Sequence, residues 1–174
     1  MKDATVATLL SAGRCRPDII KPVVGSTHCS NWLQVTQGQI DKFAVATGDR
    51  QWIHRDDVEP EVSPFRGPIA HGLLLASLTI SLARDCGALP DATWVIYGFD
   101  TLRFRSPVRS GARIRCRTTI QSVRELSGRI LVGTRFVLEI EDQKIPALVT
   151  NCSFLGLSPI MELPANVFGQ SLAG

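Results

Sequence analysis

The chain lacks any long hydrophobic run. No stretch approaches the roughly 18 consecutive apolar residues that a membrane-spanning helix needs. Its start, MKDATVATLL, carries only a short apolar patch with Asp3 near the front. This pattern speaks against a membrane-spanning helix and is a poor match to a secretory signal peptide. We therefore expect a cytoplasmic protein that has no membrane partner.

Metal-ligand and disulfide spacings are missing as well. The five cysteines are Cys15, Cys29, Cys86, Cys116 and Cys152. They contain no C-x-x-C pair, and the three histidines contain no H-x-x-x-H pair. Structural zinc sites, catalytic zinc helices and disulfide frameworks depend on such spacings. No basic motif interleaved with aromatic residues is present either. We expect free, buried or half-buried thiols, no metal and no nucleic-acid partner.

What the chain does have is an ordinary globular composition with an uneven charge. Its 174 residues, 44% hydrophobic and 20% charged, suit one domain with a substantial core. We expect a single domain over residues 1–174, with the core at about residues 30–155. An N-terminal arm with one strand near Trp32–Val35 and a loose C-terminal tail would flank it. The net charge is +3, but residues 103–138 alone hold nine basic groups and one acid.

The segment TQGQIDKFAVATGD predicts a short helix that ends at Gly48. Thr36 and Gln39 have the spacing of a capping box, in which each side chain satisfies a free backbone N–H group. Apolar or small residues recur at helical spacing from Ile40 onward. Glycine can adopt the left-handed conformation that ends a helix. Asp49 is therefore expected directly after a sharp turn of the chain.

A second helix is predicted in RGPIAHGLLLASLTISLARDCG, after a charged, proline-containing loop over residues 55–66. Pro68 suits the first turn of a helix, because its missing N–H group is not needed there. From Ile69 to Ala83 the segment is apolar on all sides. A helix with this pattern must be enclosed, and it is too short to span a membrane, so we expect it to be buried within the protein.

After Gly87 the sequence changes to a period of two. Four segments rich in β-branched and aromatic residues predict strands. They are Thr93–Arg105, Ala112–Arg124, Arg129–Glu141 and Ile145–Leu155. The connections SPVRSG, ELSG and EDQK between them resemble hairpin turns, so an antiparallel meander is expected. The fold class that follows is α+β, with a curved antiparallel sheet wrapped around one long central helix.

Two motifs together carry a resemblance to a known family. FAVATGDRQWIHRD and SPFRGPIAHGLLLASL resemble the MaoC-like dehydratases, which include the (R)-specific enoyl-CoA hydratases, and look closest to the NodN-type branch. LRFRSPVRSGARIR is similar to a strand–turn–strand segment of that family. The resemblance covers roughly residues 30–155 and implies the hot-dog fold.

The resemblance implies an enzyme, an acyl-thioester hydratase/dehydratase. Such an enzyme adds or removes water across the 2,3 double bond of an enoyl-CoA or enoyl-carrier-protein substrate. The family motif G-D-x-N-P-x-H stands here as Gly48 to His54, so the resemblance assigns catalysis to Asp49 and His54. As general base and then acid, they would hold the water and move its proton.

The resemblance also implies a substrate-binding region around the second helix. Gly72, near the start of that helix, is expected to hold the thioester oxygen, because the first turn leaves N–H groups unpaired and favours negative charge. We assign His71, Gln51 and Trp52 to the same oxyanion and substrate-binding region. Alternatively, His71 orders the loop, and Trp52 packs in the core or at an interface. Gln51-Trp52 replaces the family's Asn-Pro, and a difference in specificity is expected there.

The arginines of residues 103–138 alternate along the predicted strands. Arg103 and Arg105 share one strand face, as do Arg113, Arg115 and Arg117. Two interpretations are open. The arginines form the solvated outer face of the sheet, or they form a basic surface for the phosphates of coenzyme A or for an acidic acyl carrier protein.

Two other functions share the predicted fold. Hot-dog acyl thioesterases generally carry a carboxylate or amide on the central helix, and residues 72–84 contain none. A non-hydratase biosynthetic or binding protein that has kept the acyl site is the other alternative. For a hydratase, the resemblance implies a homodimer with sites near the subunit interface. It implies no metal or cofactor beyond the coenzyme A or carrier-protein phosphopantetheine of the substrate.

Overall fold

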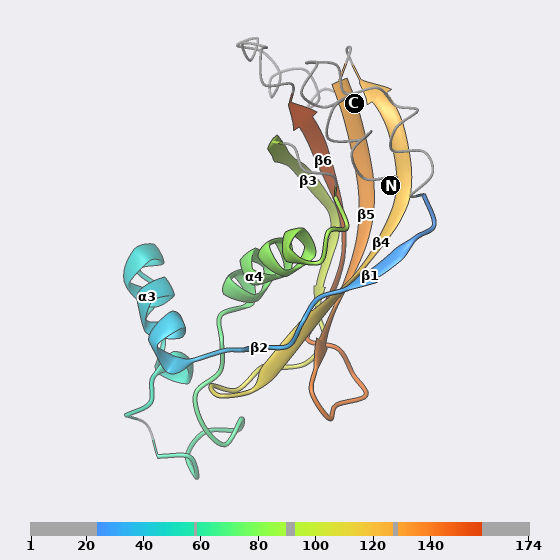
Figure 1. Cartoon of the computed structure of the whole chain (residues 1–174). Coiled ribbons are helices and arrows are strands. Elements are labelled where there is room, and N and C mark those ends of the chain that lie inside the picture. Colours follow the sequence, from blue (N-terminus) through green and yellow to red (C-terminus); the bar gives the residue numbers. More distant parts are fainter. Residues whose placement is uncertain (1–23, 58, 90–92, 127–128, 158–174) are drawn as a thin grey trace.

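The structure of the protein is a computed structural model that describes residues 24–57, 59–89, 93–126 and 129–157 (Figure 1). The elements in chain order are β1 (Thr27–Cys29), β2 (Leu33–Gln34), α3 (Gln37–Thr47), the short 3₁₀ helix η2 (Trp52–His54), α4 (Gly72–Asp85), β3 (Thr93–Phe104), β4 (Arg113–Leu126), β5 (Arg129–Ile140) and β6 (Leu148–Leu157). Most of the predicted N-terminal arm and nearly all of the C-terminal tail lie outside the described residues. The strand near residues 32–35 is present as β2.

The first predicted helix is confirmed, together with both of its ends. The Thr36 hydroxyl accepts from the Gln39 N–H group, and the Gln39 side chain accepts from the Thr36 N–H group at 2.9 Å. This is the reciprocal capping box expected from the sequence. At the other end, Gly48 has φ 77° and its N–H group donates to the carbonyl of Ala44. Ile40 is fully buried and joins α3 to the core.

The predicted start of the second helix is wrong. Ile69 forms a β-bridge with Arg109, and its N–H group donates to the Ile53 carbonyl at 2.9 Å. The Ala70 N–H group donates to the Val108 carbonyl at 2.8 Å. His71 is extended, with φ −61° and ψ 138°, so α4 begins only at Gly72.

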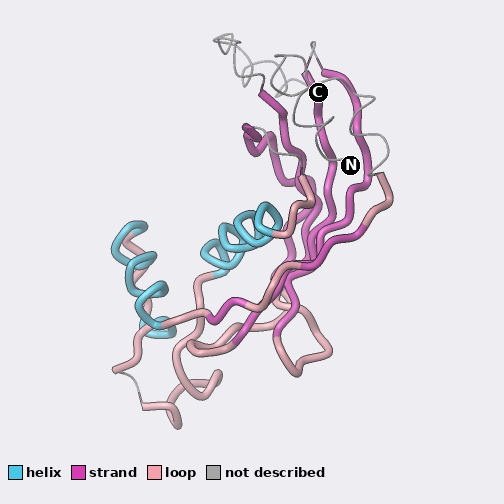
Figure 2. The backbone as a smooth tube through the Cα atoms, in the orientation of Figure 1, coloured by secondary structure: helices cyan, strands magenta, loops and turns pink. Residues whose placement is uncertain are grey.

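Complete burial of α4 was also an incorrect expectation. The helix lies against the concave side of the curved sheet, with Leu75 and Leu82 among its buried residues (Figures 1 and 2). Its other side is open in the single chain, and Leu73 is 61% exposed. A large apolar side chain left in solvent on the central helix indicates a surface that another body covers.

The sheet is antiparallel, as predicted, but its strand order differs from a simple meander. β4, β5 and β6 follow one another as hairpins, whereas β3 pairs with β6 rather than with β4. The full order is β1-β4-β5-β6-β3, with β2 also paired to β4. SPVRSG is therefore a crossing connection and not a hairpin turn, which corrects the sequence interpretation.

The crossing connection is fixed by contacts outside the sheet. Val108 is fully buried, and its carbonyl accepts from Ala70 just before α4. The Gly111 N–H group, at φ 85°, donates to the Val35 carbonyl at 2.7 Å. These bonds attach the connection to the segments that precede α3 and α4. The connection itself carries the chain from one edge of the sheet toward the other. The expected α+β architecture, with a sheet curved around α4, is confirmed.

The outer face of β4 and β5 accounts for one set of arginines. Arg115 and Arg117 both donate to the Glu139 carboxylate, at 2.7 and 2.6 Å, and Arg113 donates to Glu141 at 2.7 Å. The Arg115 guanidinium also lies 4.6 Å from the centre of the Trp32 ring. These three arginines are paired on the solvated face, which agrees with the first of the two interpretations.

The described thiols match the expectation of free cysteines. Cys29, Cys86, Cys116 and Cys152 are all unpaired to one another, and the last two are buried in the core. Burial raises the pKa of the Cys116 and Cys152 thiols to about 12. No helix in the described ranges combines the length and the hydrophobicity needed to cross a membrane.

Candidate active site

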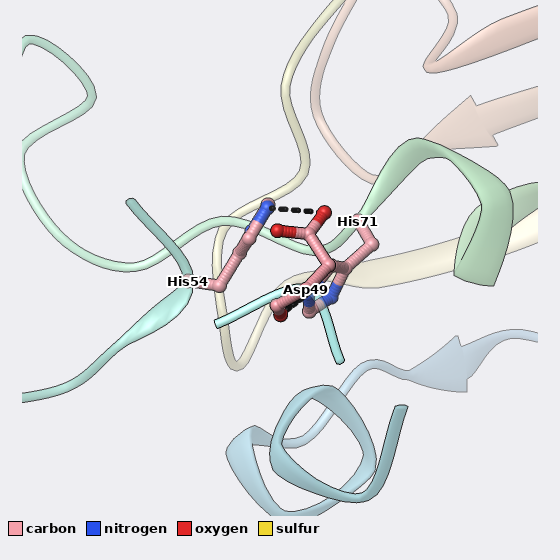
Figure 3. A group of neighbouring side chains, drawn as sticks. All are labelled: Asp49, His54 and His71. Atoms are coloured by element: carbon pink, nitrogen blue, oxygen red, sulfur yellow. Dashed lines mark hydrogen bonds and ion pairs between the residues drawn. The ribbon is translucent and has the colours of Figure 1, made fainter. Parts of the chain in front are cut away.

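Asp49 stands where the chain turns away from α3. Gly48 ends the helix in the left-handed conformation, and Asp49 follows it with a side chain that is 40% exposed. The Gln51 side-chain amide donates to Asp49 Oδ1 at 3.0 Å, and the Gln51 backbone N–H group donates to the same oxygen at 3.4 Å. Oδ1 is therefore anchored within its own loop, and Oδ2 faces His54 (Figure 3).

His54 approaches the carboxylate from the end of η2. Its Nε2 lies 3.9 Å from Asp49 Oδ2, and the side chain is buried. The Nδ1 atom is 2.7 Å from the Ile69 carbonyl oxygen. Because a carbonyl can only accept, Nδ1 must carry the hydrogen, and this assigns the tautomer. In the neutral ring, Nε2 is then the bare basic nitrogen that faces Asp49.

The main chain of His54 is held by α3. The Gln37 side-chain amide donates to the His54 carbonyl at 2.8 Å and to Asp41 Oδ1 at 2.8 Å. One helix thus carries Asp49 at its end and fixes His54 from its first turn. The spacing of five residues in the sequence becomes a facing pair in the structure.

His71 is the third member of the cluster in Figure 3. It occupies the N-cap position of α4 and is buried. Its Nε2 lies 3.0 Å from the backbone carbonyl of Asp49, and its ring stacks on that of His54 with centroids 3.6 Å apart. The Phe43 ring of α3 lies on it as well, with centroids 5.0 Å apart.

The Asp49, His54 and His71 side chains could be taken for a metal site, because each offers a ligand atom within 4.8 Å of the others. The ring geometry argues against it. An imidazole bound at about 2.1 Å has its centroid roughly 3.2 Å from the metal, so two rings at a right angle are at least about 4.5 Å apart. The observed centroids are only 3.6 Å apart. The stacked rings would have to separate before both could bind one ion.

A cavity of about 410 Å³ opens beside His54. It is lined by Ile53, His54, Ile69, Ala70, Gly72, Leu75, Phe104, Arg105, Ser106 and Pro107. The lining is mostly apolar, with an imidazole, a helix N-terminus, one guanidinium and the side chain of Ser106 as its polar groups. This combination is typical of a site for an elongated apolar ligand with a polar end.

Gly72 is the first residue of α4 and borders the cavity. A Cβ atom at this position would lie 2.9 Å from the Phe104 ring. The glycine therefore permits a close approach of β3 to the helix N-terminus. N–H groups in the first helical turn have no partner within the helix and point toward its N-terminal end, where a ligand in the cavity could reach them.

The structure separates the residues that the sequence placed together. His54 and Gly72 line the cavity, whereas Gln51 and Trp52 do not. Gln51 contacts the Asp49 carboxylate instead. Trp52 is 46% exposed, so it is not part of the core of this chain.

Two cavity residues, Phe104 and Ser106, were not singled out from the sequence. They lie at the end of β3 and in the crossing connection, and only the unpredicted strand order brings them to α4. Arg105 is different, because its alternation with Arg103 had already marked it, and it is the basic side chain that reaches this cavity.

Gln51 stabilises the ionised form of Asp49. Its hydrogen bond is the largest influence on this carboxyl and holds the pKa of Asp49 below its usual value, with a smaller contribution from His54. Replacing Gln51 by Leu removes a donor that stabilises the carboxylate, so the pKa of Asp49 rises. NMR titration of the carboxyl carbon measures this change, and Gln143→Leu, at an exposed position between β5 and β6, is the matched control that leaves the titration in place.

The comparison with known proteins identifies the family. The profile described as "MaoC like domain" matches residues 21–142 of the chain. The chain belongs to the MaoC-like family. Nodulation protein N of Rhizobium leguminosarum bv. viciae is 40% identical over 131 residues, which cover 70% of this chain and 78% of that protein. The MaoC-like resemblance seen in the two sequence motifs is thereby confirmed.

One further relative and one solved structure are similar to the chain. 3-Hydroxyacyl-thioester dehydratase Z of Mycobacterium tuberculosis is 34% identical over 122 residues, which cover 69% of this chain and 81% of that protein. The solved structure of the (R)-hydratase from A. caviae involved in PHA biosynthesis aligns with a TM-score of 0.64 and 21% identity. That alignment covers 75% of this chain and 94% of the other, and it shows the shared hot-dog fold.

Proposed function

We propose that the protein is an acyl-thioester hydratase/dehydratase of the (R)-specific enoyl-CoA hydratase type. The observation that carries this proposal is the facing pair of Asp49 Oδ2 and His54 Nε2, 3.9 Å apart, with His54 on the wall of a mostly apolar cavity. The cavity also reaches a helix N-terminus at Gly72. One site thus offers a base, an acyl pocket and hydrogen-bond donors for an oxygen.

The facing pair suits the activation of one water molecule. A water oxygen at about 2.8 Å from both atoms would subtend an angle near 90°, which allows a hydrogen bond to each. His54 Nε2 takes a proton as the water oxygen bonds to C3 of the enoyl group. The Asp49 carboxylate, whose lowered pKa keeps it ionised, stabilises the resulting imidazolium. The proton is then delivered to C2, and dehydration follows the same steps in reverse.

The negative charge that develops on the thioester oxygen needs donors. We assign this role to the N–H group of Gly72, because it stands at the N-terminus of α4, where the helix dipole favours negative charge. The acyl chain would then lie along the apolar wall formed by Ile53, Leu75 and Phe104. Oxygen and chain are thus held by different groups of one cavity.

The group that carries the acyl chain as a thioester, here called the handle, would be coenzyme A or the phosphopantetheine of a carrier protein. Arg113, Arg115 and Arg117 are occupied by carboxylates on the outer face of the sheet. Arg105 is the arginine that lines the cavity, so we assign contact with an anionic part of the handle to it. We propose no metal and no further cofactor. A cytoplasmic location fits a charged substrate of this kind, which does not cross membranes.

Turnover of enoyl thioesters tests the proposed function. The purified protein is incubated with crotonyl-CoA and longer trans-2-enoyl-CoAs, or with the matching carrier-protein thioesters, and the loss of enoyl absorbance is followed. Hydration is expected, with no release of free thiol. Absence of turnover on every chain length and handle would contradict the proposal and favour a non-hydratase biosynthetic or binding role.

Release of thiol from the same substrates would indicate a thioesterase instead. The structure does not favour that outcome. The only carboxylate or amide side chain on α4 is Asp85, at its last residue, about twenty ångströms along the helix from Gly72 at about 1.5 Å per residue. It cannot reach a thioester held at the helix N-terminus.

We also propose that the protein forms a homodimer through β3. This strand is an edge of the sheet in the part of the chain that the structure describes, and it is 12 residues long. Three of its large apolar side chains, Ile96, Tyr97 and Phe99, are 36–41% exposed. A long apolar edge is a site for pairing with another strand, and the exposed Leu73 of α4 would be covered by the same partner.

Light scattering on the purified protein is expected to give about twice the mass of the 19.0 kDa chain. Phe99→Lys puts a charge on the paired edge and should shift the mass toward that of one chain. The matched control is Val62→Lys, because Val62 is 72% exposed and lies in a loop. A single-chain mass for the unaltered protein, or the same dimer for Phe99→Lys, would count against this interface.

A further inference from the structure

His71 joins the two halves of the site. Its ring Nε2 is 3.0 Å from the backbone carbonyl of Asp49, and this carbonyl can only accept, so Nε2 carries the hydrogen. The next residue in the chain is Gly72, the first residue of α4. A single hydrogen bond thus connects the loop that carries the acid to the helix end that faces the cavity.

The same ring also supports His54. The two imidazoles stack with 24° between their planes, and Phe43 lies on His71 at an angle of 49°. Phe43 belongs to α3, which also fixes the His54 carbonyl through Gln37. The orientation of the His54 ring is therefore set by its own bond to Ile69 and by the face of His71.

Packing alone does not explain an imidazole at position 71. Since Nε2 carries the hydrogen, Nδ1 is a bare acceptor in the neutral ring, and it is buried with no hydrogen-bond partner among the described residues. A buried acceptor without a partner destabilises a fold. Phenylalanine would fill the space between Phe43 and His54 without this cost. What phenylalanine cannot supply is the N–H donor to Asp49.

We propose that His71 is a positioning residue for the Asp49–His54 pair. By holding the Asp49 carbonyl and the plane of the His54 ring, it sets the distance between Oδ2 and Nε2 and places both relative to the N–H group of Gly72. We assign it no contact with the substrate, because its Nε2 is engaged with the Asp49 carbonyl and its Nδ1 is buried. The expected effect of His71 on catalysis rests on the proposed function. The contacts of His71 are independent of that function.

Two variants separate the donor from the stack. His71→Gln keeps an N–H donor near the position of Nε2 but loses the flat ring. His71→Phe keeps a ring between Phe43 and His54 but has no donor. If the bond to Asp49 carries the role, His71→Phe lowers kcat roughly 10- to 100-fold while KM changes less than about twofold. His71→Gln is expected to recover most of the lost kcat.

Other kinetic outcomes would overturn the proposal. Equal losses of kcat in both variants would show that the donor has no special role. A rise in KM with kcat unchanged would place His71 in substrate binding instead. Thermal unfolding is measured for both variants, and an unfolded His71→Phe would be replaced by His71→Leu, which also lacks the donor.

A second readout needs no turnover. The carbonyl carbon of Asp49 shifts when it loses a hydrogen bond, so its NMR signal is expected to move in His71→Phe and to stay near its original position in His71→Gln. An unchanged signal in His71→Phe contradicts the contact. A changed signal in a protein that hydrates no enoyl thioester would support the contact and reject the proposed function, so the two failures are distinguishable.

Discussion

Asp49→Asn and His54→Asn are each expected to lower kcat for enoyl-CoA hydration by roughly 10²–10⁴. Both changes preserve the local structure. Asparagine at position 49 keeps an oxygen that can accept from the Gln51 amide, which donates to Asp49 Oδ1 in the unaltered protein. Asparagine at position 54 places its amide nitrogen near the position of His54 Nδ1, the atom that contacts the Ile69 carbonyl in the unaltered protein. What is lost is the basic carboxylate in the first variant and the bare Nε2 in the second.

The two losses should not add. Both groups act on the same water molecule, so the double variant should be little slower than the worse single variant. Asp56→Asn and His28→Asn are the matched controls, since Asp56 is exposed nearby in the chain and His28 lies on β1. Full activity in either single variant at position 49 or 54 would falsify the proposed roles. Steady-state kinetics on crotonyl-CoA provide the measurement.

Gly72→Pro is expected to lower kcat by roughly 10²–10³ relative to Gly72→Ala, the cost typical of one lost oxyanion donor. Proline has no N–H group, and the first position of a helix is where it fits best. The residue before it must be extended, and His71 already has φ −61° and ψ 138°. The substitution therefore removes the donor without requiring a new backbone conformation.

Gly72→Ala supplies the necessary control. Both variants add a Cβ atom that would lie 2.9 Å from the Phe104 ring, so both must displace that ring. Phe104 is 49% exposed and can move. Only the proline variant loses the N–H group, so the ratio of the two kcat values reports chiefly on the donor. A ratio near one, with both proteins folded by circular dichroism, would exclude Gly72 from oxyanion binding.

Local signals in the sequence were enough to predict α3 and the four long strands, although not the short β1. The capping box of Thr36 and Gln39 and the glycine at position 48 act within one turn of chain, so they determine the ends of α3 directly. The start of α4 depends on distant partners, because Ile69 forms a β-bridge with Arg109 and Ala70 donates to Val108. Propensity favoured a helix from Pro68, and these tertiary contacts hold the chain in another path.

The candidate site also has some features that the local sequence predicts and others that depend on the tertiary structure. Asp49, His54 and Gly72 could be found from motif spacing. The structure places His54 and Gly72 on the wall of one cavity, and Asp49 faces His54. The stack of His71 on His54 could not be found, because residues 17 apart in the sequence become neighbours only through the loop between η2 and α4. The ion pairs of Arg113, Arg115 and Arg117 likewise required the register of β4 against β5.

The pairing of β3 with β6 also constrains how the chain can fold. Thr93 lies opposite Leu157 and Phe104 lies opposite Leu148, so the contacts close loops of about 44 to 64 residues. Contacts this distant in sequence slow the folding of β proteins. During synthesis, β3 is made well before its partner β6, so its aromatic side chains stay exposed until β6 is made. Among the described residues, β6 is the last strand in the sequence and the one that joins β3 to the sheet, so a chain that stops short of residue 148 lacks the partner of β3.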